Sequence, residues 1–151
     1  RPVMQVAPYR AFEVVLVQVL RQLMEHSLVQ NGMLAGMAHP RLRMALVAMH
    51  EAPQENWSLE RLAESCGMSR SVFANTFREV VGCTPGAYLL DWRIAVAQRL
   101  LRKGHTAQFT ADAVGYGSES AFSRAFTGHV GQPPRPWSVA QRNAQAQPVS
   151  G

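Results

Sequence analysis

The fold is decided by residues 111–126, which have the sequence ADAVGYGSESAFSRAF. Gly115 can adopt the positive φ that a sharp turn between two helices requires. Ser118 can cap the helix that follows the turn. Phe122 and Phe126 are spaced to lie on one buried face of that helix. The stretch therefore predicts a helix, a tight turn and a second helix.

The side chains of this stretch divide into inner and outer sets. Ala111 is small, which lets the second helix cross close to the first, and Glu119 suits the positive end of the second helix. Ser120, Ser123 and Arg124 are left on the outer face. A helix-turn-helix with an exposed, polar second helix of this size can enter a DNA major groove.

The same arrangement occurs a second time, about 48 residues earlier in the chain. Gly115 corresponds to Gly67, and the helix cap Thr106 corresponds to Ser58. The offset grows by one residue in the turn, where insertions are tolerated most easily. The later matches are Phe122 with Phe73, Phe126 with Phe77, Gly131 with Gly82, Pro134 with Pro85 and Trp137 with Tyr88. Two units in register predict a double helix-turn-helix.

Residues 58–101, SLERLAESCGMSRSVFANTFREVVGCTPGAYLLDWRIAVAQRLL, followed by residues 113–126, resemble the DNA-binding domain of AraC/XylS-type bacterial transcription regulators. The resemblance runs from about Pro40 to Trp137. It implies an all-α fold in which one long central helix joins two helix-turn-helix units that dock on the same face of DNA. It also implies a sequence-specific regulator of promoter DNA that works with RNA polymerase. The effector is expected to bind an upstream domain.

Composition agrees with a polyanionic partner. The 151 residues carry a formal charge of +5 and give a pI near 10.0, and 47% of them are hydrophobic, enough for a core. Lys103 is the only lysine, and arginine suits bidentate contacts to phosphate and guanine. The alternative is that the preference for arginine over lysine only reflects genome composition.

Other classes of protein find little support. Cys66 and Cys83 lie far apart with no CxxC spacing, which favours a reduced cytoplasmic location over a disulfide framework. The histidines are scattered, and no phosphate loop, activated nucleophile or carboxylate cluster is present. We therefore expect no metal site, no cofactor and no enzymatic activity. Neither a membrane-spanning run nor a signal peptide is recognisable, and we expect no membrane partner.

The sequence predicts three regions. Residues 1–36 are expected to be the end of an upstream domain and a linker, with a hydrophobic helix over residues 9–30 that forms a homodimer. That helix could instead pack on the absent domain or fold back on the DNA-binding part. Residues 37–138 are expected to form the double helix-turn-helix domain, and residues 139–151 a disordered tail.

The helices of the first unit follow from caps and apolar spacing. His39 is expected to cap a helix that runs from Pro40 to about Glu51, and Ser69 to cap one that runs to about Val81. On the second of these, the predicted core side is Val72, Phe73 and Phe77.

A central helix is predicted from Pro85 to about Lys103, with an apolar stripe made of Tyr88, Leu89, Trp92, Val96 and Leu100. Such a rod is roughly 28 Å long at the standard helical rise. It can hold two helices near the ~34 Å repeat of the duplex.

The second unit departs from the family at two places. Thr110 stands where a large aliphatic residue is usual, and the bulky side chain has moved to Phe109, which periodicity places partly outside the core. Pro133, Pro134 and Pro136 are expected to shorten the final helix, although Trp137 can still fill the core.

Two sets of residues are expected to contact DNA. By resemblance, the base-contacting positions are Ser71, Ala74 and Asn75 in the first unit and Glu119, Ser120 and Arg124 in the second. Arg124 suits guanine, Asn75 suits adenine and Glu119 suits cytosine. Phosphate contacts are expected from Arg70, Arg78 and Arg102 and from the backbone amides after Ser69 and Ser118. The alternatives are an ordinary solvated surface, or a helical module that binds a protein such as RNA polymerase.

Overall fold

A computed structural model describes residues 16–17, 20 and 32–146 of the chain. These residues form helices and connecting turns without any strand, which confirms the predicted all-α fold class. The helices are α2 (Leu42–Glu51), α3 (Leu59–Ser65), α4 (Arg70–Val81), α5 (Pro85–Arg102), α6 (Ala107–Ala113), α7 (Glu119–Val130) and α8 (Pro134–Ala146). Among them, none has the length and hydropathy needed to cross a membrane.

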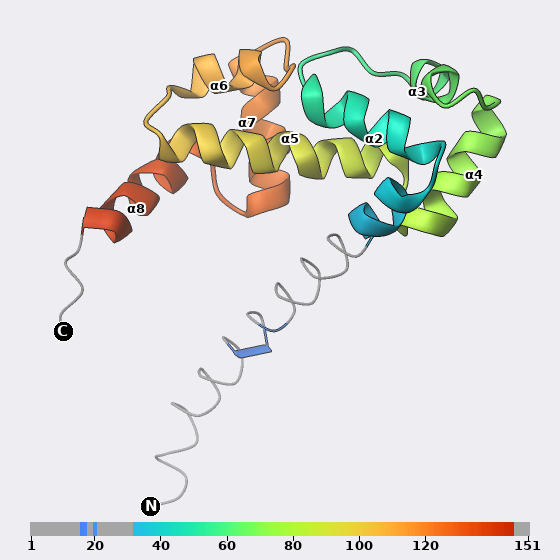
Figure 1. Ribbon diagram of the computed structural model, residues 1–151. Helices are drawn as coiled ribbons and strands as arrows, with labels where there is room; N and C mark the ends of the chain where they lie inside the picture. Colours follow the sequence, from blue (N-terminus) through green and yellow to red (C-terminus); the bar gives the residue numbers. More distant parts are fainter. Residues whose placement is uncertain (1–15, 18–19, 21–31, 147–151) are drawn as a thin grey trace, which may run out of the picture.

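The long helix α5 organises the other helices (Figure 1). α2, α3 and α4 gather around its first half, and α6, α7 and α8 gather around its second half. α4 and α7, the second helices of the two predicted units, cross α5 at different points along its length. The predicted pair of helix-turn-helix units joined by one central helix is therefore confirmed.

The buried residues fall into two hydrophobic cores that share no member. The first core is built from α2, α3, α4 and the start of α5, and it includes Leu46, Phe73, Phe77 and Tyr88. The second core is built from the end of α5 with α6, α7 and α8. Because each core lies on its own half of α5, the helix is the main covalent and packing link between the two units.

The sequence repeat is reproduced in the aromatic packing of the two cores. Phe73 and Phe77 have ring centroids 5.7 Å apart, and their counterparts Phe122 and Phe126 lie 5.6 Å apart. Phe77 meets the edge of Tyr88 at 5.8 Å. Its counterpart Phe126 meets Trp137 at 5.4 Å with a similar geometry. α4 and α7, the expected recognition helices, are thus each held by an equivalent aromatic trio.

The predicted helix caps are also present. The side chains of Ser58, Ser69, Thr84, Thr106 and Ser118 each accept a hydrogen bond from a backbone amide three residues further on. Each bond satisfies one of the amides that a helix N-terminus leaves without a partner. The His39 imidazole accepts from the amides of Arg41 and Leu42 at 3.2 Å, but α2 begins at Leu42 with Arg41 at its N-cap, so the predicted start at Pro40 is two residues too early.

Polar and aromatic side chains fasten α2 to α5. His50 stacks on Trp92 with 4.1 Å between ring centroids, and its Nε2 shares a hydrogen bond of 2.5 Å with the Tyr88 hydroxyl. Burial lowers the pKa of His50 and, as the largest cause, raises the pKa of Tyr88 to about 12. The two side chains therefore meet as neutral groups near pH 7, which suits a half-buried contact.

The predicted apolar stripe of α5 is fully buried near the start of the helix and only half-buried further along. Tyr88 and Leu89 are buried, as predicted, but Trp92, Val96 and Leu100 are only half-buried. The second core buries Ile94, Ala97 and Leu101, which were not in the predicted stripe, and Val96 and Leu100 pack against it as partly buried side chains. Ile94 lies roughly 140° around the helix from Leu89 at about 100° per residue. A single stripe fails because α5 buries two different faces, one in each core.

Position 110 has a simple structural explanation. The first helix of the second unit forms normally, with Thr110 fully buried and Phe109 half exposed, as the periodicity predicted. The Thr110 hydroxyl donates to the Thr106 carbonyl at 2.7 Å. Because the hydroxyl is satisfied within its own helix, it can occupy a core position without an unpaired polar group.

Two expectations about the C-terminus are wrong. The prolines do not shorten the last helix, because α8 extends from Pro134 to Ala146. Pro134 and Pro136 fall in its first turn, where amide groups have no partner within the helix, so nothing is lost. The helix continues past Ser138, so residues 139–146 are not the disordered tail that was predicted. Residues 147–151 lie outside the described residues.

The segment before α2 packs closely on the first unit. Residues 32–38 are helical, and Met33 and Met37 lie against the first core. A Cβ at Gly36 would come within 2.5 Å of the Leu46 side chain. The predicted boundary between residues 36 and 37 falls inside this helical segment. Most of the predicted helix 9–30 lies outside the described residues.

The turn glycines provide a test of how closely the two units approach each other. Gly67 and Gly115 occupy equivalent turns with φ of 64° and 89°. A Cβ at Gly67 meets nothing within 4 Å, whereas one at Gly115 would lie 2.8 Å from the Gln54 carbonyl oxygen in the α2–α3 loop.

Gly67→Ala should cost about 1–2 kcal/mol of unfolding free energy from the left-handed backbone alone.

Gly115→Ala should cost clearly more than Gly67→Ala, because the methyl group also pushes the turn away from the loop. Urea unfolding of the two variants beside the parent protein measures the difference. Equal losses would contradict the close approach of the second turn to the first unit.

Candidate nucleic-acid interface

The outer face of α4 carries the residues predicted for DNA contact in the first unit. Ser71, Asn75 and Arg78 are exposed, and Ala74 is half-buried. Ser69 is exposed at the helix start, where its hydroxyl accepts from the Val72 amide at 3.4 Å. The core side of the same helix is formed by Phe73, Phe77 and Val81. The structure therefore brings the predicted contact residues together on one accessible helix.

A shallow cleft runs beside this face. It has a volume of about 360 Å³ and lies between α3, α4 and the start of α5. Ala74, Asn75 and Arg78 line it together with Trp57 and Gly86. These three α4 residues consequently face a surface hollow and not the protein interior.

The outer face of α7 carries the equivalent residues of the second unit. Ser118, Ser120 and Arg124 are exposed, and Ser123 is half-buried. The Ser118 hydroxyl accepts from the Ala121 amide at 3.1 Å and lies 3.3 Å from the Ser120 hydroxyl. Phe122 and Phe126 are fully buried on the opposite side. Neither Arg124 nor Asn75 is buried, so both can reach a ligand.

An ion pair lies at the N-terminus of each recognition helix. In the first unit, Arg70 lies 3.1 Å from the Glu60 carboxylate of α3. In the second unit, Glu119 accepts from Arg135 of α8 at 2.8 Å. The pairs reverse the charges, because the recognition helix supplies the arginine in one unit and the carboxylate in the other. Glu119 therefore already has a cationic partner, which sequence reasoning did not foresee.

Arg102, the third predicted phosphate contact, lies at the end of α5 and packs on α8. Its guanidinium stands 5.2 Å from the centre of the Trp137 ring, and its Nε donates to the Gln141 side chain at 3.5 Å. The side chain is exposed and lies against α8 of the second unit.

Val72 was assigned to the core, and that assignment is wrong. Its side chain is 52% exposed, beside the predicted contact residue Ser71. Helical geometry could have shown this, since Val72 is about 100° around the helix from Phe73 on the side away from Phe77. An exposed branched apolar side chain on this face suits contact with a thymine methyl group.

The fold and the paired exposed helices define a double helix-turn-helix domain. A family model described as a helix-turn-helix domain matches residues 62–138, about half of the chain. The chain belongs to the AraC-type family of helix-turn-helix domains, as the sequence resemblance indicated.

Two curated relatives illustrate the similarity. A putative AraC-like transcription regulator of Streptomyces lividans is 43% identical over 123 residues, which cover 80% of this chain and 40% of that protein. The regulator AlkR of Acinetobacter baylyi is 44% identical over 103 residues, which cover 68% of this chain and 34% of that protein. The chain thus spans well under half the length of these relatives.

Two solved structures share the fold. The DNA-binding domain of AdpA, crystallised in complex with a target DNA, has a TM-score of 0.68 at 28% identity, covering 73% of this chain and 100% of that one. An AraC-type regulator from Chromobacterium violaceum has a TM-score of 0.62 at 28% identity, covering 72% of this chain and 95% of that one.

Proposed function

We propose that the protein is a sequence-specific DNA-binding transcription regulator that inserts α4 and α7 into successive major-groove segments on one face of promoter DNA. The observation that carries this proposal is the matched pair of helices, each with a buried aromatic side and an exposed polar side, mounted on one helix. α5 is about 27 Å long at the standard rise. That length is comparable with the ~34 Å repeat of B-DNA.

The comparisons support the same proposal. The AdpA domain, which has a TM-score of 0.68 to this chain, was crystallised with its target DNA, and the relatives from Streptomyces and Acinetobacter are transcription regulators by name. The formal charge of +5 favours association with a polyanion and predicts strong dependence on salt.

Individual side chains have distinct roles in this proposal. Arg124 reads guanine and Asn75 reads adenine, while Ser71, Ser120 and the exposed Val72 supply smaller contacts. Arg70 and Arg78 bind phosphate, helped by the amides at the starts of α4 and α7. Ala74 offers apolar contact only. Glu119 either releases Arg135 to accept from cytosine or keeps the pair, in which case Arg135 is positioned for phosphate. Ser69 and Ser118 hold the helix starts, and Arg102 gives a further phosphate contact at the end of α5.

The proposal extends to other binding partners. A second copy would pack on the hydrophobic segment of residues 9–30, which the sequence predicts to be helical and of which Leu16, Val17 and Leu20 are described and are 44%, 53% and 49% exposed. The greater length of the relatives supports an additional domain, which would bind the effector. As a regulator of promoters, the protein would act in the cytoplasm together with RNA polymerase.

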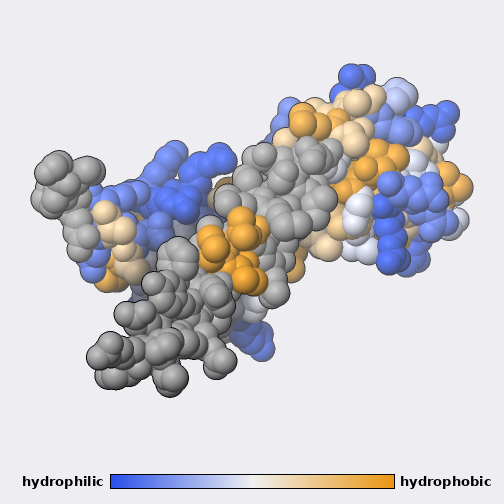
Figure 2. All heavy atoms as spheres, turned by 90° about the horizontal axis from the view of Figure 1, so that it is seen from below, coloured by the Kyte–Doolittle hydropathy of each residue, from blue (hydrophilic) through white to orange (hydrophobic). Residues whose placement is uncertain are grey.

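The rival function is a helical module that binds another protein. Exposed apolar side chains favour it, and apolar patches interrupt the hydrophilic surface on the face seen in Figure 2. The polar and basic outer faces of α4 and α7 favour nucleic acid instead, because protein-binding helix faces are usually apolar at their centre.

Selection of bound duplexes from a random DNA pool decides between these functions. The expected product is a site with two conserved major-groove segments about one helical turn apart. Its affinity should fall steeply between roughly 50 and 200 mM salt, because bound counterions are released. A pool that shows no enrichment over many rounds, with weak binding at every salt concentration, would leave the protein-binding module as the better account.

Arg124 and Arg78 should have different effects on binding to the selected site. Arg124→Ala should lose about 1–3 kcal/mol on the selected site and very little on random DNA. Arg78→Ala should weaken binding to all sequences alike and reduce the salt slope by about 1. Anisotropy titrations with both probes at several salt concentrations measure these effects. An equal loss on selected and random DNA for Arg124→Ala would show that this arginine does not read a base.

A further inference from the structure

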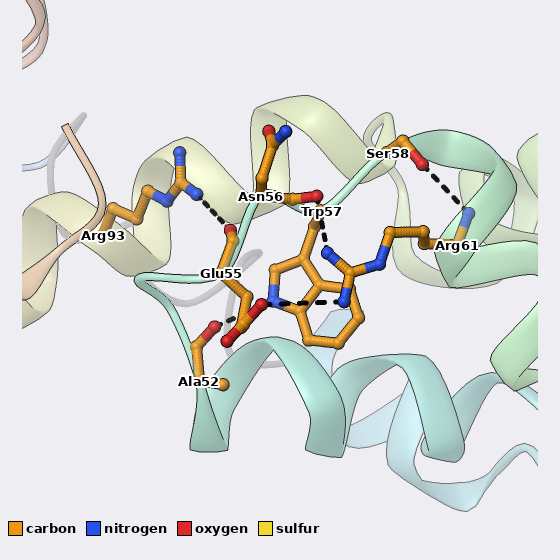
Figure 3. Close-up of polar contacts among 7 residues, drawn as sticks. All are labelled: Ala52, Glu55, Asn56, Trp57, Ser58, Arg61 and Arg93. Atoms are coloured by element: carbon orange, nitrogen blue, oxygen red, sulfur yellow. Dashed lines mark hydrogen bonds and ion pairs between the residues drawn. The ribbon is translucent and has the colours of Figure 1, made fainter. Parts of the chain in front are cut away.

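The loop between α2 and α3, residues 52–58, lies at the junction of the two units. Figure 3 shows the side chains that hold it. The Trp57 indole nitrogen donates to the Ala52 carbonyl at 2.8 Å, which closes the loop on itself. The outer edge of the loop meets the second unit, since the Gln54 backbone packs against Gly115. The loop belongs to the first unit by sequence but contacts both.

Arg93 ties this loop to the middle of α5. Its Nε donates to the Pro53 carbonyl at 2.8 Å. Its Nη2 donates to the Glu55 carbonyl at 2.9 Å, the bond drawn in Figure 3. Arg93 is placed between Leu89, a buried residue of the first core, and Ile94, a buried residue of the second. Burial lowers the pKa of Arg93, yet a guanidinium stays charged at pH 7, so both hydrogen bonds are charge-assisted.

The same guanidinium reaches the second unit. Its central carbon lies 5.8 Å from the centre of the Tyr116 ring, in the turn between α6 and α7. Tyr116 in turn packs on Phe122 of the recognition helix with ring centroids 5.7 Å apart. A chain of contacts therefore runs from the α2–α3 loop through Arg93 and Tyr116 to α7.

This chain of contacts matters because, apart from α5 itself and its Asp91–His129 pair with α7 at 3.4 Å, few contacts join the two units among the described residues. Their cores have no residue in common, and among the described helices, those of the first core make no extensive contact with α6, α7 or α8. Without a brace, α5 is free to bend and twist slightly between its two loads. A small bend near the middle of a long helix displaces the elements packed at its two ends relative to each other.

We propose that Arg93 is a positioning residue that fixes the orientation of α4 relative to α7 and thereby sets the spacing between the two DNA segments that the protein binds together. The inference rests on the proposed function. Arg93 itself does not touch DNA in this account. It acts by keeping the second recognition helix at a fixed position once the first has bound, which raises its effective concentration at the neighbouring segment.

Arg61 is a matched control in the same loop. Its Nη1 donates to the Asn56 carbonyl at 2.8 Å, and its guanidinium stacks on Trp57 at 4.6 Å and pairs with Glu55 at 3.6 Å (Figure 3). These contacts fasten the loop to α3, within the first unit. Arg61 thus resembles Arg93 in chemistry and loop contacts but does not connect the units.

The test compares the whole chain with Arg93→Met, Arg93→Lys and Arg61→Met on a set of duplexes. The set contains the site selected by the parent protein, the same site with its spacer lengthened or shortened by one and two base pairs, and versions in which one segment is scrambled. The parent protein should show a sharp optimum at the selected spacing.

Arg93→Met should lose roughly ten-fold or more in affinity at the selected spacing, because the effective concentration of the second recognition helix is reduced. When the spacer length changes, this variant should lose much less affinity than the parent protein does, so its spacing profile is flatter. Binding to the scrambled-segment duplexes should be unchanged. Arg93→Lys keeps the charge and can satisfy one carbonyl, so its spacing profile should fall between those of the parent protein and Arg93→Met. Arg61→Met should keep the parent's sharp profile.

A sharp, unshifted profile for both Arg93 variants would overturn the proposal. So would an equal loss on intact and scrambled sites, because that indicates general loss of structure. If Arg93→Met does not fold, Arg93→Lys decides alone by the shape of its profile. Failure of the proposed function has a different signature, since the parent protein would then select no two-segment site.

Discussion

The structure depends on burial of two faces of α5 in two separate cores. Leu89 turns toward the first core and Ile94, five residues later, turns toward the second. Each core then holds one recognition helix through a pair of phenylalanines and one further aromatic residue. The positions of α4 and α7 are therefore set by side-chain packing along a single helix, and the surface polar groups are free to serve binding.

Local features were predictable from the sequence because they depend on neighbouring residues. The caps at Ser58, Ser69, Thr106 and Ser118 follow from side chains that reach an amide three residues away. The sharp turns need a backbone in the left-handed region, which favours glycine, and Gly115 has a positive φ at such a turn. The recurrence of this punctuation was enough to predict both units and the helix between them.

Features that depend on distant residues were missed. The α5 stripe was extrapolated as one face because nothing local shows where one core ends and the next begins. The contact of Arg135 with Glu119 spans two helices, and that of Arg93 with Pro53 joins segments far apart in sequence. The length of α8 was underestimated because prolines were counted without their position in the first turn, where they cost nothing. For the interface, the exposed faces of α4 and α7 were predictable from the sequence. The ion-pair partners of Arg70 and Glu119 were not.

The central claim is that one rigid helix presents two recognition helices to neighbouring turns of the same duplex. Hydroxyl-radical footprinting of the parent protein on its selected site tests it most directly. The account predicts two protected segments about 10 base pairs apart, on one face of the DNA. A single protected segment, or two segments displaced by half a helical turn and so on opposite faces, would contradict it.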